Sequence, residues 1–147
     1  GCTALGIKAV RGGTYLAMEG PQFSTLAESK LYQDWGCEVI GMTNMPEAKL
    51  AREAEMCYAT VAMVTDYDCW HPDHDHVTVD AIIKVLLDNA GKARALVKNV
   101  VPRLANREDL CHQGCHEALD NALITAPDSR DPVMAEKLAA VAGRVLG

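Results

Sequence analysis

The spacing of apolar and polar positions changes several times along the chain, and its first part predicts a strand followed by a helix. Residues 14–18 form a short β-prone run after two glycines. Thr25 and Glu28 then have the spacing of a capping box, in which the threonine oxygen and the glutamate carboxylate bind the first free N–H groups of a helix. We therefore predict a helix from Thr25 to about Trp35, ended by Gly36.

A second strand and helix follow, and then a third apolar run. Residues 38–42 are predicted as a strand, and the Pro46-Glu47 pair is typical of a helix start, with the helix continuing to about Ala54. Residues 58–65 are almost continuously apolar, which is typical of a strand covered on both faces. This third strand is expected at the centre of a sheet.

The remaining chain has helical periodicity. Apolar residues recur every three or four positions from Thr78, which predicts a long helix to about Pro102, and shorter helices are expected at 108–123 and 131–145. Because strands that alternate with helices pair in parallel, the predicted fold class is α/β, with a partial, mostly parallel sheet flanked by helices. Three strands make a thin sheet with unpaired edges, so the chain resembles part of a larger fold.

Composition limits the function. The 147 residues are 49% hydrophobic and 23% charged with a formal charge of −6, as in an ordinary globular domain. An acidic chain without basic runs is not expected to bind nucleic acid or anionic membranes. No apolar stretch reaches the roughly 18 residues of a membrane span, so we expect a cytoplasmic protein whose six cysteines are reduced.

Polar and aromatic residues follow each predicted strand, at the edge where α/β sheets bind ligands. Asp66 and Asp68 follow the third strand; they could read the ring nitrogens and amine of a base, or could turn the chain or hold a divalent ion. Phe23, the one phenylalanine, could stack on a heterocycle or fill the core. Thr43 could bind an anion or cap the next helix.

Two clusters contain potential metal ligands. The segment His71–His76 holds imidazoles and carboxylates, but so many ligands in so short a stretch cannot converge on one ion, so we predict a solvated, mobile loop. Cys111 and Cys115 could form a zinc half-site, a stretched haem attachment motif, or buried or redox-labile thiols. Since no second ligand pair is evident, we predict thiols on one helix face with Leu119 and no metal.

Three strings, taken together, resemble a known family. They are Glu19 to Glu28 (EGPQFSTLAE), Gly41 to Glu47 (GMTNMPE) and Thr65 to Trp70 (TDYDCW). From about Gly12 to Leu104 the chain resembles the C-terminal half of the trimeric purine nucleoside phosphorylases, and the third string resembles the branch that acts on S-methyl-5′-thioadenosine. The resemblance implies a single phosphorylase domain over 1–147, with strands, base pocket and long helix in 1–104 and C-terminal helices in 105–147.

In this family inorganic phosphate is a co-substrate that attacks C1′ of the nucleoside, adenine leaves, and a sugar 1-phosphate forms without a metal or organic cofactor. The resemblance implies a role for each of eight residues: Phe23 stacks on the base, Thr65, Asp66 and Asp68 bind the base, Met42 contacts the ribose, Thr43 contacts phosphate, and Val79 and Ile82 hold the methylthio group. The resemblance also implies that Asp66 and Asp68 are the catalytic pair, because a hydrogen bond to N7 would stabilise the departing purine. The loop His71–His76 would cover the pocket.

The resemblance also implies that half of the enzyme is absent from these residues, including most phosphate ligands. We expect the chain to be active only with an N-terminal half, present as a separate chain, in a homotrimer of the complete unit. Two alternatives stay open: a phosphorylase for other purine nucleosides or methylthioinosine, and a noncatalytic half-domain with a Cys/His metal or redox site.

Overall fold

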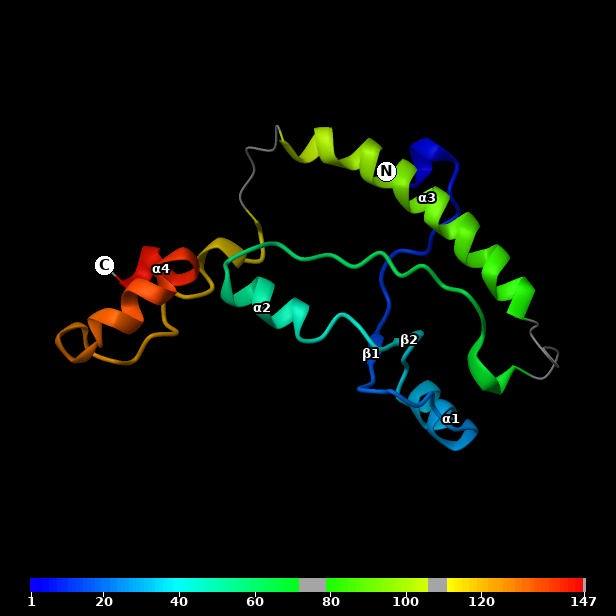
Figure 1. Cartoon of the computed structure of the whole chain (residues 1–147), viewed down its shortest axis with the longest axis horizontal. Coiled ribbons are helices and arrows are strands. Elements are labelled where there is room, and N and C mark those ends of the chain that lie inside the picture. The colour runs from blue at the N-terminus through cyan, green and yellow to red at the C-terminus, as the bar shows by residue number, and fades with distance from the viewer. Residues whose placement is uncertain (72–78, 106–110, 147) are drawn as a thin grey trace. The chain divides into compact units, whose positions relative to one another are not determined.

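A computed structural model describes residues 1–71, 79–105 and 111–146 of the chain (Figure 1). These residues form two compact units. The first unit contains Gly1–Met42 and Val61–Glu108, and the second contains Thr43–Thr60 and Asp109–Gly147. The candidate base-binding residues belong to the first unit and the C-terminal helix belongs to the second, so each unit is considered by itself.

The sheet of the first unit has two strands. Strand β1 (Tyr15–Ala17) pairs in parallel with β2 (Val39–Gly41), with Leu16 opposite Ile40. Helix α1 (Leu26–Asp34) forms the connection between them, as parallel pairing requires (Figure 1). The partial, parallel α/β arrangement predicted from the sequence is confirmed.

The predicted start and end of α1 are confirmed in detail. The Thr25 side chain accepts a hydrogen bond from the Glu28 N–H, and the Glu28 carboxylate accepts one of 2.7 Å from the Thr25 N–H. Gly36 follows the helix with φ of 79°, a conformation that favours glycine. Within α1 the side chain of Ser29 is buried, with 3% of its surface exposed.

The predicted third strand is wrong. Residues 58–65 form no strand in the described structure, and all but Thr65 are exposed, including Val61 and Val64 at 58% and 60%. A strand needs a neighbour for its N–H and C=O groups, and β1 and β2 pair with each other. In the first unit the Asn89 side chain donates instead to the Val64 carbonyl at 3.1 Å. The apolar run is therefore left uncovered.

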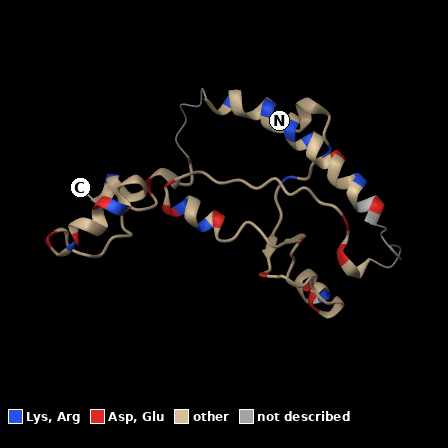
Figure 2. Ribbon diagram, viewed as in Figure 1, with Lys and Arg blue, Asp and Glu red and all other residues tan. Residues whose placement is uncertain are grey.

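The long helix is confirmed as α3 (Val79–Ala105). It continues for one turn past Pro102, a position that lacks the N–H of an ordinary helical residue, so the predicted end was early by three residues. None of the described helices is long and apolar enough to cross a membrane. Acidic and basic side chains are interspersed along α2 (Glu47–Glu53), α3 and α4 (Pro132–Leu146) (Figure 2).

In the second unit, α2 and α4 confirm the helices predicted at 46–54 and 131–145. Asp131 begins α4, since its Oδ1 accepts hydrogen bonds from the N–H groups of Val133 and Met134 at 2.8 and 3.1 Å. The helix predicted at 108–123 is wrong for its described part, 111–123. There, turns surround one short 3-10 helix, Cys115–Glu117, because Gly114 adopts φ of 62° and breaks the helical path.

Arg144 of α4 joins this helix to the end of α2. Its Nε donates to Glu55 Oε2 at 2.8 Å, and its Nη2 contacts Glu55 Oε1 and, at 2.5 Å, Asp120 Oδ1. The Leu119 N–H also donates to the Glu55 carboxylate at 3.1 Å. The arginine hydrogen bonds, with the Leu119 N–H, lower the pKa of Glu55 to about 2. The apolar residues buried among those described, Ala51, Leu119 and Ala142, all lie in this unit.

Candidate functional site

The two candidate aspartates lie in one tight turn. The Asp68 N–H donates to Asp66 Oδ1 at 2.9 Å, and the Thr65 hydroxyl donates to Asp66 Oδ2 at 2.7 Å. This is the local turn that an aspartate favours when its side chain binds the backbone two residues later. Asp68 itself has φ of 58°, and the 3-10 helix Asp68–Trp70 begins there. The turn fixes the carboxylate of Asp66 relative to the backbone of Asp68.

Two serines anchor the carboxylate of Asp68. The Ser24 hydroxyl donates to Asp68 Oδ2 at 3.0 Å, and the hydroxyl of the buried Ser29 donates to the same oxygen. Ser24 follows Phe23 in the loop after β1, and Ser29 lies on α1. These bonds join the Phe23 loop to the aspartate turn across a large sequence separation. Sequence reasoning missed both serines; the only available signal was that Ser24 stands within the loop that follows a strand.

Phe23 and Met42 follow β1 and β2 in the same unit. The Phe23 side chain is 83% exposed, so it does not fill the core of the described structure, which was the second interpretation of this residue from the sequence. Met42 is 37% exposed, and its Sδ lies 2.8 Å from where a side chain at Gly20 would begin. Gly20 has φ of 71°, and only a glycine fits there without moving the methionine. The loops after the two strands therefore meet at Gly20 and Met42.

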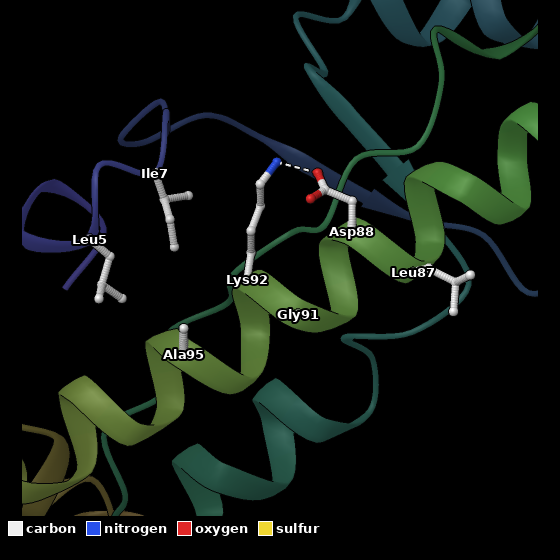
Figure 3. Close-up of a pocket in the computed structure, with 7 residues that line it drawn as sticks. All are labelled: Leu5, Ile7, Leu87, Asp88, Gly91, Lys92 and Ala95. Atoms are coloured by element: carbon white, nitrogen blue, oxygen red, sulfur yellow. Dashed lines mark hydrogen bonds and ion pairs between the residues drawn. The ribbon is translucent and has the colours of Figure 1, made fainter.

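Two hollows of the first unit can be described, and Phe23, Met42 and Asp66 line neither of them. Asp68, Ser29 and Trp70 line a hollow of about 120 Å³ beside β2. A larger hollow of about 430 Å³ lies between α3 and residues near the N-terminus, and none of the predicted site residues lines it (Figure 3). Its walls are Leu5, Ile7, Leu87, Asp88, Gly91, Lys92 and Ala95. Of the base-binding candidates, only Asp68 lines either of these two hollows.

The roles of all eight predicted site residues stay predictions. Thr43 is assigned to the second unit. Val79 and Ile82 lie one turn apart at the start of α3, as expected, but their side chains lie outside the described residues. In the proposed covering loop His71–His76, only His71 is described.

The arrangement of the cysteines differs from the prediction. Cys111, Cys115 and Leu119 do not share a helix face, because no α-helix forms at 111–123. Instead the sulfur atoms of Cys111 and Cys115 gather with that of Cys57, and all three lie within 4.8 Å of one another. The backbone N–H of Cys115, with further hydrogen bonds around the turn, lowers the pKa of the Cys111 thiol to about 6. Sequence reasoning missed Cys57, which is distant in the chain.

Comparison with known proteins identifies the family. Residues 1–102 match the model of the phosphorylase superfamily. The chain belongs to the phosphorylase superfamily. It is 69% identical over 143 residues to the S-methyl-5′-thioadenosine phosphorylase of Rhodospirillum rubrum, and 66% identical over 143 residues to that of Cereibacter sphaeroides. Each match covers 97% of this chain and 49% of the relative, so the chain spans about half the length of these relatives.

Solved phosphorylase structures share the fold. A methylthioadenosine phosphorylase from an Antarctic soil metagenomic library has a TM-score of 0.79 and 46% identity, covering 88% of this chain and 44% of that one. The Schistosoma mansoni methylthioadenosine phosphorylase in complex with adenine has a TM-score of 0.61 and 30% identity, covering 74% of this chain and 37% of that one. The α/β fold described above is therefore part of a nucleoside phosphorylase fold.

Proposed function

We propose that this chain supplies the C-terminal half of an enzyme that converts S-methyl-5′-thioadenosine and inorganic phosphate to adenine and 5-methylthioribose 1-phosphate. The observation that carries the proposal is the 69% identity, over 97% of the chain, to a phosphorylase of that name. The anchored aspartate turn beside the Phe23 loop supports it. In the reaction a phosphate oxygen bonds to C1′ while the C1′–N9 bond breaks and its electron pair leaves with adenine.

The proposed base site uses four residues of the first unit. The exposed ring of Phe23 stacks on the purine, and Thr65 lines the base pocket. With substrate bound, a proton is shared between Asp66 and N7, where negative charge gathers as the glycosidic bond breaks. Ionised Asp68 accepts from the 6-amino group; an ionised carboxylate has about four acceptor sites, so the two serine hydroxyls leave it capacity for the amine.

The remaining contacts follow from the family resemblance. Met42 lies against the ribose, Thr43 contacts phosphate, and Val79 and Ile82 form the slot for the methylthio group. Phosphate is a co-substrate, and no metal or organic cofactor takes part in bond making or breaking. A single threonine cannot hold a phosphate dianion, so residues equivalent to the other half of the relatives supply the remaining phosphate ligands.

The exposed apolar surface supports a need for that other half. Among the described residues of the first unit, Val61 and Val64 on the uncovered run and Leu87 on α3 are 58–70% exposed. Burial of such side chains stabilises a fold by about 1.5–3 kcal/mol each. We propose that an N-terminal half, present as a separate chain, covers this surface and adds strands to the sheet, and that the complete unit acts as a homotrimer in the cytoplasm.

A substrate comparison tests this function. The complete enzyme that contains this sequence is incubated with phosphate and, in separate reactions, with methylthioadenosine, methylthioinosine or inosine. We expect methylthioadenosine to have a kcat/KM at least about 10-fold higher than methylthioinosine, because Asp68 accepts from an amine and repels a carbonyl oxygen. Equal or higher kcat/KM with methylthioinosine or inosine would replace the adenine assignment with a different purine.

A further inference from the structure

Three cysteines from separate parts of the sequence converge in the second unit. Cys57 follows α2, whereas Cys111 and Cys115 flank a turn that precedes α4. Their three sulfur atoms lie within 4.8 Å of one another, and each cysteine is a free thiol. Phosphorolysis as proposed above uses none of them. The proposed reaction therefore does not account for the cysteine cluster.

The turn between Cys111 and Cys115 is shaped to present two sulfurs to one ion. Three residues separate the cysteines, within the two to four that usually separate zinc ligands on one turn. The Gly114 N–H closes the turn on the Cys111 carbonyl at 2.9 Å, and its φ of 62° is one that glycine adopts readily.

A basic side chain already contacts the cluster. Arg52, on the last turn of α2, donates from Nη1 to the Cys115 sulfur at 3.3 Å. Three thiolates around a divalent ion carry a net charge of −1, which a neighbouring guanidinium offsets. Hydrogen bonds of this kind to a ligand atom orient it and tune its affinity for the ion. Arg52 is thus placed to act as a positioning residue for Cys115.

We propose that Cys57, Cys111 and Cys115 bind one Zn²⁺ ion as thiolates, with water in the fourth position. Thiolate ligands favour zinc, and tetrahedral zinc takes sulfur atoms at about 2.3 Å, which places neighbouring sulfurs about 3.8 Å apart, a separation compatible with three sulfurs that all lie within 4.8 Å of one another. The ion cross-links the end of α2 to the turn before α4, next to the link that Glu55 makes to Leu119. Its role is structural, and it takes no part in phosphorolysis.

The zinc content of the full chain tests the proposal. The chain is purified under reducing conditions without chelators, loaded with one equivalent of ZnCl₂ and dialysed before zinc is measured. We expect about one zinc per chain to remain. Serine substitution of Cys57, Cys111 or Cys115 should lower zinc affinity by more than about 100-fold, since loss of a supporting contact alone costs 10-fold to 100-fold. Cys2→Ser, in the first unit, is the matched control and should bind zinc as the parent chain does.

Two further measurements use the unsubstituted chain, so they do not depend on whether the cysteine variants fold. In the unsubstituted chain, zinc should protect the three clustered cysteines from alkylation while Cys2 and Cys37 react, as mapped by mass spectrometry. Cobalt in place of zinc should give thiolate-to-metal charge-transfer absorption. Zinc that is lost on dialysis, equal alkylation of all cysteines with and without zinc, or a disulfide between two clustered cysteines in the reduced preparation would each overturn the proposal. Selective retention of copper(I) would also overturn it.

Discussion

The hydroxyl of Ser24 donates a 3.0 Å hydrogen bond to Oδ2 of Asp68. This contact joins the loop that carries Phe23 to the turn that carries both candidate aspartates. Ser29, buried on α1, donates to the same carboxylate oxygen. The position of Asp68 therefore depends on two hydroxyl groups that precede it by about forty residues, and the turn cannot move independently of α1.

Removal of the Ser29 hydroxyl should destabilise the protein. Ser29→Ala leaves the Asp68 carboxylate short of one hydrogen bond in a partly buried setting, which we expect to lower the free energy of unfolding by about 1–2 kcal/mol. Urea unfolding measures this change. Ser129→Ala, at an exposed position, is the control and should stay within about 0.5 kcal/mol of the parent protein. Equal stability of the two variants would show that Ser29 does not support the turn.

Asp66→Asn should slow phosphorolysis with little effect on folding. An amide can donate a hydrogen bond to N7 but cannot transfer a proton to it, so kcat should fall by about 10²-fold to 10⁴-fold in the complete enzyme. Asp88→Asn is the matched control, because Asp88 is exposed on α3 and forms an ion pair with Lys92, away from the candidate aspartates in the sequence. An Asp66→Asn enzyme with the kcat of this control would remove Asp66 from the mechanism.

Phe23→Ala should weaken nucleoside binding without loss of stability. The ring is 83% exposed, so its truncation removes little packing, whereas loss of base stacking should raise KM by about 5-fold to 150-fold, the equivalent of about 1–3 kcal/mol. Steady-state kinetics with methylthioadenosine and urea unfolding measure the two effects. Val10→Ala, at a residue 92% exposed, is the control. An unchanged KM would mean that the base does not stack on Phe23.

The Glu55–Arg144 pair should make the second unit sensitive to acid. The pKa of Glu55 is about 2 in the folded chain and near 4.5 when unperturbed, so its contribution to stability is complete above pH 4.5. That contribution is lost as pH falls from 4.5 toward 2. Glu55→Gln should therefore show a smaller loss of stability than the parent between about pH 6 and about pH 3, by urea unfolding. Glu136→Gln, at an exposed position on α4, should keep the parent's pH dependence.

Local signals in the sequence were sufficient for the features that local interactions determine. The capping box at Thr25 and Glu28 placed the start of α1, because both of its hydrogen bonds lie within one turn. The run at 58–65 failed as a strand because a strand depends on neighbours, which apolar residues alone do not supply. The helix predicted at 108–123 failed at Gly114, whose left-handed backbone outweighs the apolar periodicity around it.

Long-range contacts of the candidate sites could not be predicted. The Asp66 turn is local and could be predicted as a candidate site, but the serines that anchor Asp68 lie before β2, and nothing in their spacing points to that carboxylate. The place of Cys57 in the cysteine cluster could not be predicted for the same reason. Cys111 and Cys115 were seen as an incomplete pair, and only folding of the second unit brings Cys57 to them.

The phosphate dependence of adenine release tests the central claim most directly. The complete enzyme that contains this sequence is supplied with methylthioadenosine, with and without inorganic phosphate, and the products are separated by chromatography. The account predicts adenine and 5-methylthioribose 1-phosphate in equal amounts, formed only when phosphate is present. Release of adenine with free methylthioribose at the same rate in both reactions, or no release in either, would contradict it.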